Sequence, residues 1–98
     1  MSERDWSALR DRRSAAPGAA DTHEAARLAV ELGRTVRELR ERRGWSQLQL
    51  SQAAGMTQSE IARFEAGGTM PSMLVLVGLA RSLDASLAIQ FQPRAAAA

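Results

Sequence analysis

The sequence contains no cysteine, no lysine and no tyrosine, and only one histidine among its 98 residues. Without cysteine, neither a disulfide framework nor a thiolate metal site is possible. No cluster of potential ligands accompanies His23, so we interpret it as a surface residue and expect no metal site. The chain also shows no acid pair or nucleophile with a partner that would perturb its pKa. We therefore expect no enzymatic activity and no cofactor.

Aromatic residues and long apolar runs are also scarce. Two Phe and two Trp are the only aromatic residues, although apolar residues make up 45% of the chain. The core must therefore be largely aliphatic, which suits packed helices. No run of 18 or more apolar residues occurs, so we expect no membrane span. The charged segment 1–13 lacks the apolar stretch of a signal peptide. We expect one small soluble domain that acts inside the cell, in the cytoplasm.

The excess of positive charge is small and local. Because every cation is arginine, few groups titrate between neutrality and the arginines, and a net charge of +2 gives an isoelectric point of about 10.9. Residues 24–45 contain six Arg and four acidic residues, whereas the segments before and after are balanced. The charge therefore favours nucleic acid only modestly, and mostly just before residue 46.

The most informative stretch is residues 46–66, where two short helix patterns flank Gly55. Each pattern begins with a capping box and a hydrophobic staple, in which a cap residue pairs with the third residue after it. The boxes are Ser46 with Gln49 and Thr57 with Glu60, and the staples are Trp45 with Leu50 and Met56 with Ile61. Gly55 suits the left-handed position that ends a helix. Two capped helices joined by a tight glycine turn predict a helix-turn-helix.

A long helix precedes this motif. We expect it to begin at Asp21 or Thr22, since either can cap it. Apolar residues at positions 28, 32, 36 and 39 lie on one face of such a helix. Gly44 is placed to end it, and Gly33 leaves open whether the helix is broken in the middle.

A strongly apolar helix and a short alternating segment follow the motif. Ser72 can cap the helix, which we expect to run from Met73 to about Leu83. Residues 86–91 alternate apolar and polar side chains, which predicts one half-buried strand. Since a single strand needs a partner, we expect this strand to pair with the same strand of a second copy through Leu87, Ile89 and Phe91, giving a twofold homodimer. Residues 92–98 form a tail.

Residues 1–20 are expected to be an arm and linker, because Pro17 and Gly18 interrupt a stretch of small residues. Trp6 and Leu9 cannot build a core by themselves. They dock on the chain's own domain, contact a partner, or belong to an idle tail, and the sequence leaves these three alternatives open.

From Leu32 to Leu83 the chain resembles the helix-turn-helix family of phage-repressor type, also called the Xre or Cro/repressor family. The residues that carry this resemblance are Leu39, Arg40, Gly44, Ser46, Gln47, Leu50, Ala53, Ala54, Gly55, Ile61, Phe64, Glu65, Gly67, Pro71, Leu79 and Ala80. The resemblance implies an all-α, lambda-repressor-like bundle of four or five helices over residues 21–85. It also implies that the second motif helix enters the DNA major groove and that Arg40 and Glu65 form a structural ion pair.

The resemblance also implies a set of DNA-contacting positions. Gln47 matches a phosphate-contacting residue, and Gln58, Ser59 and Arg63 match base-contacting residues. Helix geometry agrees, because burying Ile61 and Phe64 turns positions 58, 59, 62 and 63 outward. The full predicted set is Gln47, Thr57, Gln58, Ser59, Ala62, Arg63, Gly68 and Thr69, in which Ala62 meets a thymine methyl group and the loop residues offer backbone amides to phosphate. The alternative interpretation is that these are ordinary solvated side chains.

Double-stranded DNA with a palindromic operator, bound by a homodimer, is thus the expected partner. A looser resemblance to antitoxins of the HigA type implies a second partner, a small RNA-cleaving toxin that the chain neutralises while repressing the shared operon. Toxin contact would then involve Trp6, Leu9, Arg10 and Arg13, together with the outer face of the helix at residues 24–43. The alternatives are a dimeric regulator without a toxin and an interaction module that no longer binds DNA.

Overall fold

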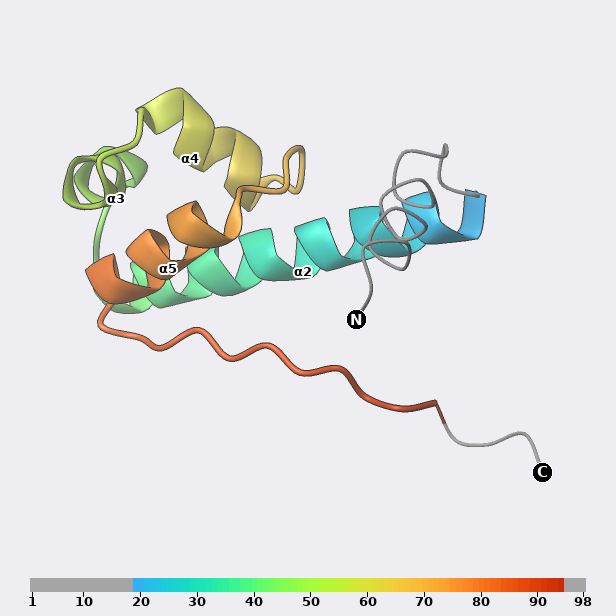
Figure 1. Cartoon of the computed structure of the whole chain (residues 1–98). Coiled ribbons are helices and arrows are strands. Elements are labelled where there is room, and N and C mark those ends of the chain that lie inside the picture. Colours follow the sequence, from blue (N-terminus) through green and yellow to red (C-terminus); the bar gives the residue numbers. More distant parts are fainter. Residues whose placement is uncertain (1–18, 95–98) are drawn as a thin grey trace, which may run out of the picture.

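The computed structural model describes residues 19–94, in which four helices alternate with short connections (Figure 1). The helices are α2 (Ala19–Arg42), α3 (Gln47–Ala54), α4 (Gln58–Glu65) and α5 (Met73–Ser82). The all-α helix-turn-helix bundle expected from the sequence is confirmed. The predicted partner contacts of Trp6, Leu9, Arg10 and Arg13 lie outside the described residues.

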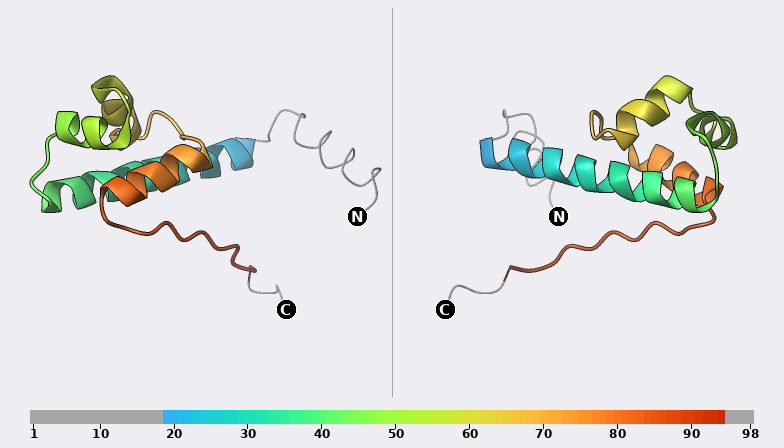
Figure 2. Two further views of the ribbon diagram at one scale, coloured as in Figure 1. Left: turned by 60° about the vertical axis from the view of Figure 1, so that its left-hand side comes forward. Right: turned by 180° about the vertical axis from the view of Figure 1, so that it is seen from behind.

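The four helices form two layers. α3 and α4 lie together on one side of the molecule, and α2 and α5 lie on the other (Figures 1 and 2). The core fills the space between the layers, where Leu50, Ile61, Phe64 and Leu79 have no exposed surface. Three of these four side chains are aliphatic, as the shortage of aromatic residues requires.

α2 is one uninterrupted helix of 24 residues, so Gly33 does not break it. Gly33 is buried, and a Cβ atom there would overlap the backbone carbonyl oxygen of Phe64. Glycine at this position therefore lets α2 cross directly against the end of α4. The predicted caps were wrong, because α2 begins at Ala19 and Asp21 lies in its first turn. Alanine has the highest helix propensity, so the two alanines before Asp21 extend the helix.

Both predicted capping boxes are present. The Ser46 hydroxyl accepts a hydrogen bond from the Gln49 backbone N–H at 3.1 Å, and the Gln49 side chain accepts one from the Ser46 N–H at 2.7 Å. Thr57 and Glu60 make the same pair of bonds at 3.1 and 3.0 Å. Gly55 ends α3 with φ of 68°. The turn between the motif helices is therefore fixed by the bond from the Gly55 N–H to the Ser51 carbonyl before it and by the Thr57–Glu60 capping box after it.

Each helix is followed by a residue with positive φ, and this residue is glycine in all but one case. A glycine with positive φ ends each of the first three helices, namely Gly44, Gly55 and Gly67. At the end of α5 the same position is taken by Asp84, with φ of 53°. The predicted cap Ser72 is confirmed at the start of α5, where its hydroxyl accepts from the Val75 N–H.

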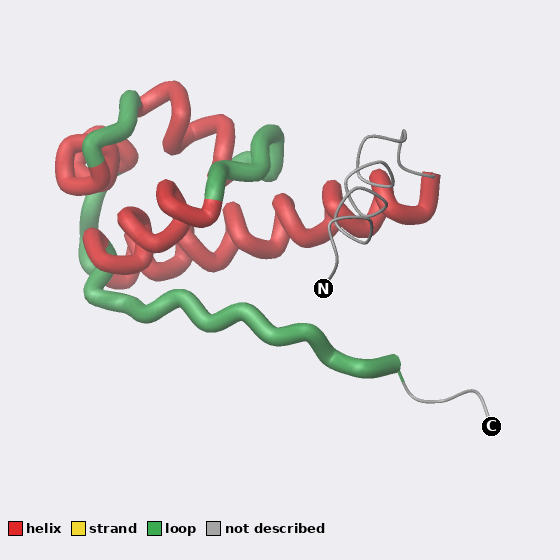
Figure 3. Tube along the Cα trace, viewed as in Figure 1, coloured by secondary structure: helices red, strands yellow, loops and turns green. Residues whose placement is uncertain are grey.

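Residues 86–91 do not form the predicted strand in this single chain (Figure 3). A strand requires a neighbouring strand to complete its backbone hydrogen bonds, and residues 19–94 contain no other strand. We call residues 85–94 the C-terminal tail. Within the described part of the chain, no helix is long and apolar enough to cross a membrane.

Candidate DNA-binding surface

The second motif helix, α4, has one buried and one exposed side. Ile61 and Phe64 are completely buried, whereas Gln58, Ser59 and Arg63 are exposed, and Ala62 is half-buried. This division follows the helical spacing of the sequence. The predicted base-contacting side chains therefore share one accessible face of a helix whose other face is anchored in the core.

The start of α4 carries a negative charge that is fixed in place. The Glu60 carboxylate accepts the Thr57 backbone N–H, which lowers the pKa of Glu60 below its usual value, with further lowering by the Thr57 hydroxyl and the positive charge of Arg63. Glu60 is therefore ionised at neutral pH. Thr57 is exposed, but its hydroxyl already caps α4. Its predicted DNA contact must share that oxygen with the cap.

Arg40 joins three parts of the fold. Its Nε and Nη2 atoms donate to the two carboxylate oxygens of Glu65 at 2.7 and 2.9 Å, and its Nη1 donates to the Trp45 carbonyl at 2.7 Å. The Glu65 side chain is only 3% exposed, and its hydrogen bonds raise the pKa of Arg40 above its usual value. The ion pair implied by the resemblance is therefore confirmed. It ties α2 to the end of α4 and to the residue that precedes the α3 cap.

Gln47, the first residue of α3, belongs to the same network. Its Nε2 donates to Glu65 Oε1 at 3.3 Å, and the side chain is half-buried. A side-chain amide nitrogen carries two N–H groups, so one of them stays available for a DNA phosphate. The bond to Glu65 was not foreseen from the sequence, because it joins positions 18 residues apart.

The loop after α4 differs from expectation at Gly68. Its backbone N–H donates to the Arg63 carbonyl at 2.9 Å as part of the helix end, so this amide is not open for the predicted phosphate contact. Thr69 is half-buried and makes no hydrogen bond to other described residues. Together with Arg63 it borders a cavity of about 240 Å³ between α4 and the loop. Of the two loop candidates, Thr69 is thus the one with free donors.

One cation near the motif was not singled out from the sequence. The Arg43 guanidinium lies over the Trp45 ring, 4.4 Å from its centroid. Such stacking holds an exposed arginine in place. Arg43 lies three residues before Ser46, the residue that caps α3. The arginine-rich end of the long helix was the available signal. Arg43 therefore adds an anchored positive charge four residues before Gln47 in the sequence.

No group of three or more His, Cys, Asp or Glu side chains in residues 19–94 is placed to hold a metal ion. The predicted DNA-contacting side chains that are polar, namely Gln47, Thr57, Gln58, Ser59, Arg63 and Thr69, carry amide, hydroxyl and guanidinium groups. Groups of these kinds hydrogen-bond to base edges and phosphates.

A model of the helix-turn-helix family matches residues 36–90, which is more than half of the chain. The chain belongs to the helix-turn-helix family. Among solved structures, this member of the family is similar to the restriction-modification controller protein C.AhdI from Aeromonas hydrophila, with a TM-score of 0.58 and 33% sequence identity over 59% of this chain and 88% of that one. No curated protein matches the sequence. The family and the structural similarity support a DNA-binding transcriptional regulator of Xre type.

Proposed function

We propose that the protein is a homodimeric repressor that binds a palindromic operator through α4. The observation that carries this proposal is the placement of Gln58, Ser59 and Arg63 on the exposed side of α4, opposite the buried side chains of Ile61 and Phe64. A capped helix seated in the core in this way presents fixed donors and acceptors to the major groove.

Each exposed group has a chemically suitable target. The Arg63 guanidinium can bond the O6 and N7 atoms of guanine, and the Gln58 amide can bond the N6 and N7 atoms of adenine. Gln47, Arg43 and Thr69 suit phosphate oxygens, which position the protein without specifying sequence. The Ser59 hydroxyl can donate to or accept from a base edge, and the Ala62 methyl group can contact a thymine methyl group.

Charge favours a dimer over a monomer as the DNA-binding form. The motif at 46–66 contains Arg63 against Glu60 and Glu65, so one copy neutralises few phosphates and binds non-specifically only weakly. Two copies on half-sites about one DNA turn apart combine their affinities. Leu87, Ile89 and Phe91 are the apolar residues we assign to dimerisation.

The operon under control is a second question, for which we propose a toxin–antitoxin pair. The first half of α2 extends beyond the other helices (Figure 1). Leu28, which belongs to this half, is 43% exposed. In the sequence, the arm with Trp6, Leu9, Arg10 and Arg13 precedes this helix. We propose that the arm and the first half of α2 bind a small toxin together. The similarity to a controller protein favours, as the alternative, a regulator of restriction and modification genes without a toxin.

Selection of DNA from a random library by the wild-type protein tests the DNA-binding proposal. We expect enrichment of a site with twofold symmetry whose half-site centres lie about 10 base pairs, or a multiple of one turn, apart. Enrichment of no sequence, or of a site without symmetry, would contradict it.

Co-expression with the neighbouring reading frames tests whether the protein has a toxin partner. A small protein that co-purifies with the full chain, and separates from a variant lacking residues 1–20, is expected for an antitoxin. If none co-purifies and the neighbours encode a nuclease and a methyltransferase, the controller alternative holds.

A further inference from the structure

A second surface, on the side of α5 that faces away from the core, exposes large apolar side chains. We define the outer face of α5 as Leu74, Val77 and Arg81, which are spaced three and four residues apart and so share one side of the helix. Leu74 is 83% exposed and Val77 is 41% exposed, whereas Leu76 and Leu79 on the opposite side are buried. The exposed side of α5 therefore carries two large apolar residues beside Arg81, although the water-facing side of a helix is expected to be mostly polar.

The C-terminal tail is apolar along one side and leaves its own domain. Leu87 still packs partly against the core, but Ile89 is 58% exposed and Phe91 is fully exposed. The views in Figures 1 and 2 agree that the tail runs away from the helices after its first residues. Two large apolar side chains at regular spacing thus face water in the single chain.

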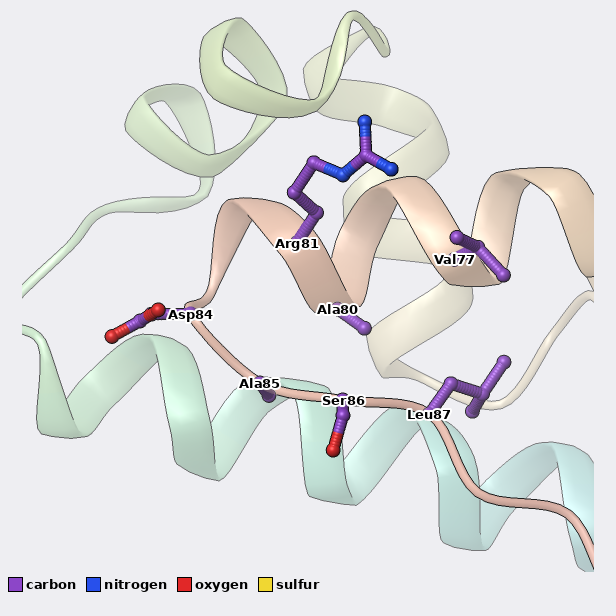
Figure 4. A pocket seen from close by; sticks show the side chains of 7 residues that line it. All are labelled: Val77, Ala80, Arg81, Asp84, Ala85, Ser86 and Leu87. Atoms are coloured by element: carbon purple, nitrogen blue, oxygen red, sulfur yellow. The ribbon is translucent and has the colours of Figure 1, made fainter.

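A cleft of about 340 Å³ lies where the tail begins (Figure 4). Val77 and Ala80 of α5 border it on one side, and Leu87 of the tail borders it on the other, with Arg81, Asp84, Ala85 and Ser86 completing the lining. The cleft joins the outer face of α5 to the tail, so the two apolar surfaces are continuous.

Two unpaired charges flank this surface. Neither Arg81 nor Asp84 has an ion-pair partner among residues 19–94. Asp84 takes the left-handed position that glycine takes at the other helix ends, and it places a negative charge at a helix C-terminus, where the helix dipole opposes it. Under a twofold axis, Arg81 of each copy can meet Asp84 of the other, which offsets this cost.

The tail is long enough to reach a second copy. Leu87 packs on its own domain, so the part of the tail that can reach a partner runs from Leu87 to Arg94. An extended chain spans about 3.3 Å per residue, so these seven steps cover roughly 23 Å. α5 has ten residues and is about 15 Å long at 1.5 Å per residue. A tail that crosses the twofold axis can therefore lie along the whole of a partner's α5.

We propose that two copies exchange their C-terminal tails, each laying Ile89 and Phe91 on the outer face of α5 in the other copy. This inference rests on the proposed homodimer and names its interface. It differs from edge-to-edge pairing of residues 86–91, which would leave Leu74 and Val77 bare and would rely on a two-stranded ribbon that is marginally stable alone.

Cross-linking tests the exchange directly, since the natural chain has no cysteine. A Val77→Cys variant and an Ile89→Cys variant, each a full chain with one thiol at an exposed position, are mixed and oxidised. Exchange predicts a disulfide-linked heterodimer of the two variants. A Val77→Cys/Ile89→Cys double variant should give linked dimers rather than a link within one chain.

Three outcomes would overturn the exchange. A link within the double variant's single chain would show that the tail folds back on its own domain. Linkage of Ile89→Cys with itself, without the mixed product, would show that the tails pair with each other. Linkage of Val77→Cys with itself alone would show that α5 faces meet without the tails.

Truncation of the apolar side chains gives a second measurement. We expect Phe91→Ala to raise the dimer dissociation constant about 10- to 100-fold in sedimentation equilibrium, because the aromatic burial is lost. Gln90→Ala, on the opposite side of the tail, is the matched control and should leave it unchanged. Equal dissociation constants for the two variants would contradict the exchange.

Operator selection by the wild-type protein separates the tail exchange from the proposed DNA binding. A selected operator without the mixed cross-link contradicts only the tail exchange. A cross-linked dimer that selects no operator contradicts only the proposed DNA binding.

Discussion

At the scale of single residues, Arg63 is the side chain that we propose to contribute most to sequence recognition. It is exposed, and its helix is anchored by Phe64 beside it. Replacing Arg63 with Ala should remove about 1–3 kcal/mol of discrimination at one base position in each half-site, with little change at the others. Affinities for operators carrying each of the four bases at every position measure this. Arg34→Ala, an exposed arginine on α2, is the control, and an equal loss at all positions for Arg63→Ala would make it a phosphate contact.

Arg40 and Glu65 determine stability rather than recognition. Removing one member of a buried ion pair leaves the other charge buried and unpaired, so Arg40→Leu should lower the free energy of unfolding by about 3–5 kcal/mol in urea denaturation. The double variant Arg40→Leu/Glu65→Leu should recover much of that loss. Arg37→Ala, which breaks the exposed bond to Glu41 at 2.9 Å, should cost about 0.5 kcal/mol or less. A similarly small cost for Arg40→Leu would contradict the structural role.

The contribution of Glu60 to stability at the start of α4 depends on pH. Because its pKa is lower in the folded protein than in the unfolded chain, its contribution to stability is complete above the unfolded pKa and is lost as the pH falls through the folded pKa. The loss is thus confined to pH values below about 4.3, the usual glutamate pKa. An NMR titration of the Glu60 carboxyl group should show a higher pKa in Thr57→Val than in wild type, since the hydroxyl is gone. Thr57→Ser retains the hydroxyl, and a shift as large in that variant would assign the effect to something else.

At the scale of elements, two helical glycines should respond oppositely to alanine. A Cβ at Gly33 would overlap the Phe64 carbonyl oxygen, whereas a Cβ at Gly78 in α5 meets nothing within 4 Å. Gly33→Ala should therefore destabilise by about 1–3 kcal/mol despite alanine's better helix propensity. Gly78→Ala should stabilise by about 0.5–1 kcal/mol. Thermal unfolding measures both, and stabilisation by both would mean that α2 can move away from α4.

The helix boundaries inside the motif were predictable because their signals are local. Ser46, Thr57 and Ser72 cap the helices that follow them, and Gly55 ends α3, all through contacts within a few residues. The role of Gly33 was not predictable, because it depends on the carbonyl of Phe64 from another helix. Sequence periodicity describes one element at a time and does not show which backbone approaches it.

In the candidate site too, features set by local sequence were predictable and contacts between distant residues were not. The outward positions of Gln58 and Arg63 followed from helical spacing alone. The engagement of the Gly68 amide with Arg63, the bond from Gln47 to Glu65 and the stacking of Arg43 on Trp45 did not follow, since each depends on side-chain or loop geometry. The DNA contacts themselves stay predictions.

At the scale of the whole molecule, the charge distribution predicts a shallow dependence of operator binding on salt. With one Arg against two acids in the motif, and Arg43 as an added cation, each copy should neutralise about two phosphates. The logarithm of the operator association constant should then fall against the logarithm of salt concentration with a slope of about −4 for the dimer. Arg43→Ala should make the slope less steep by about 2, one unit per copy, and an unchanged slope would exclude Arg43 from the phosphate contacts.

The strand expected at 86–91 depends on a neighbouring strand, so its formation could not be predicted from the sequence of one chain alone. Alternating apolar residues were present, and the alternation called for a neighbour, but residues 19–94 supply none. Under the proposed tail exchange, a second copy covers Ile89 and Phe91, and the sequence of one chain does not describe that contact.

The three separate bonds that converge on Glu65 have a kinetic consequence. The short helices rely on contacts between nearby residues and can form early, as in other helical domains that fold in microseconds to milliseconds. The Arg40–Glu65 pair joins positions 25 apart and can close only once α2 and α4 have met. Weakening that pair should therefore speed the opening of the domain more than it slows its formation.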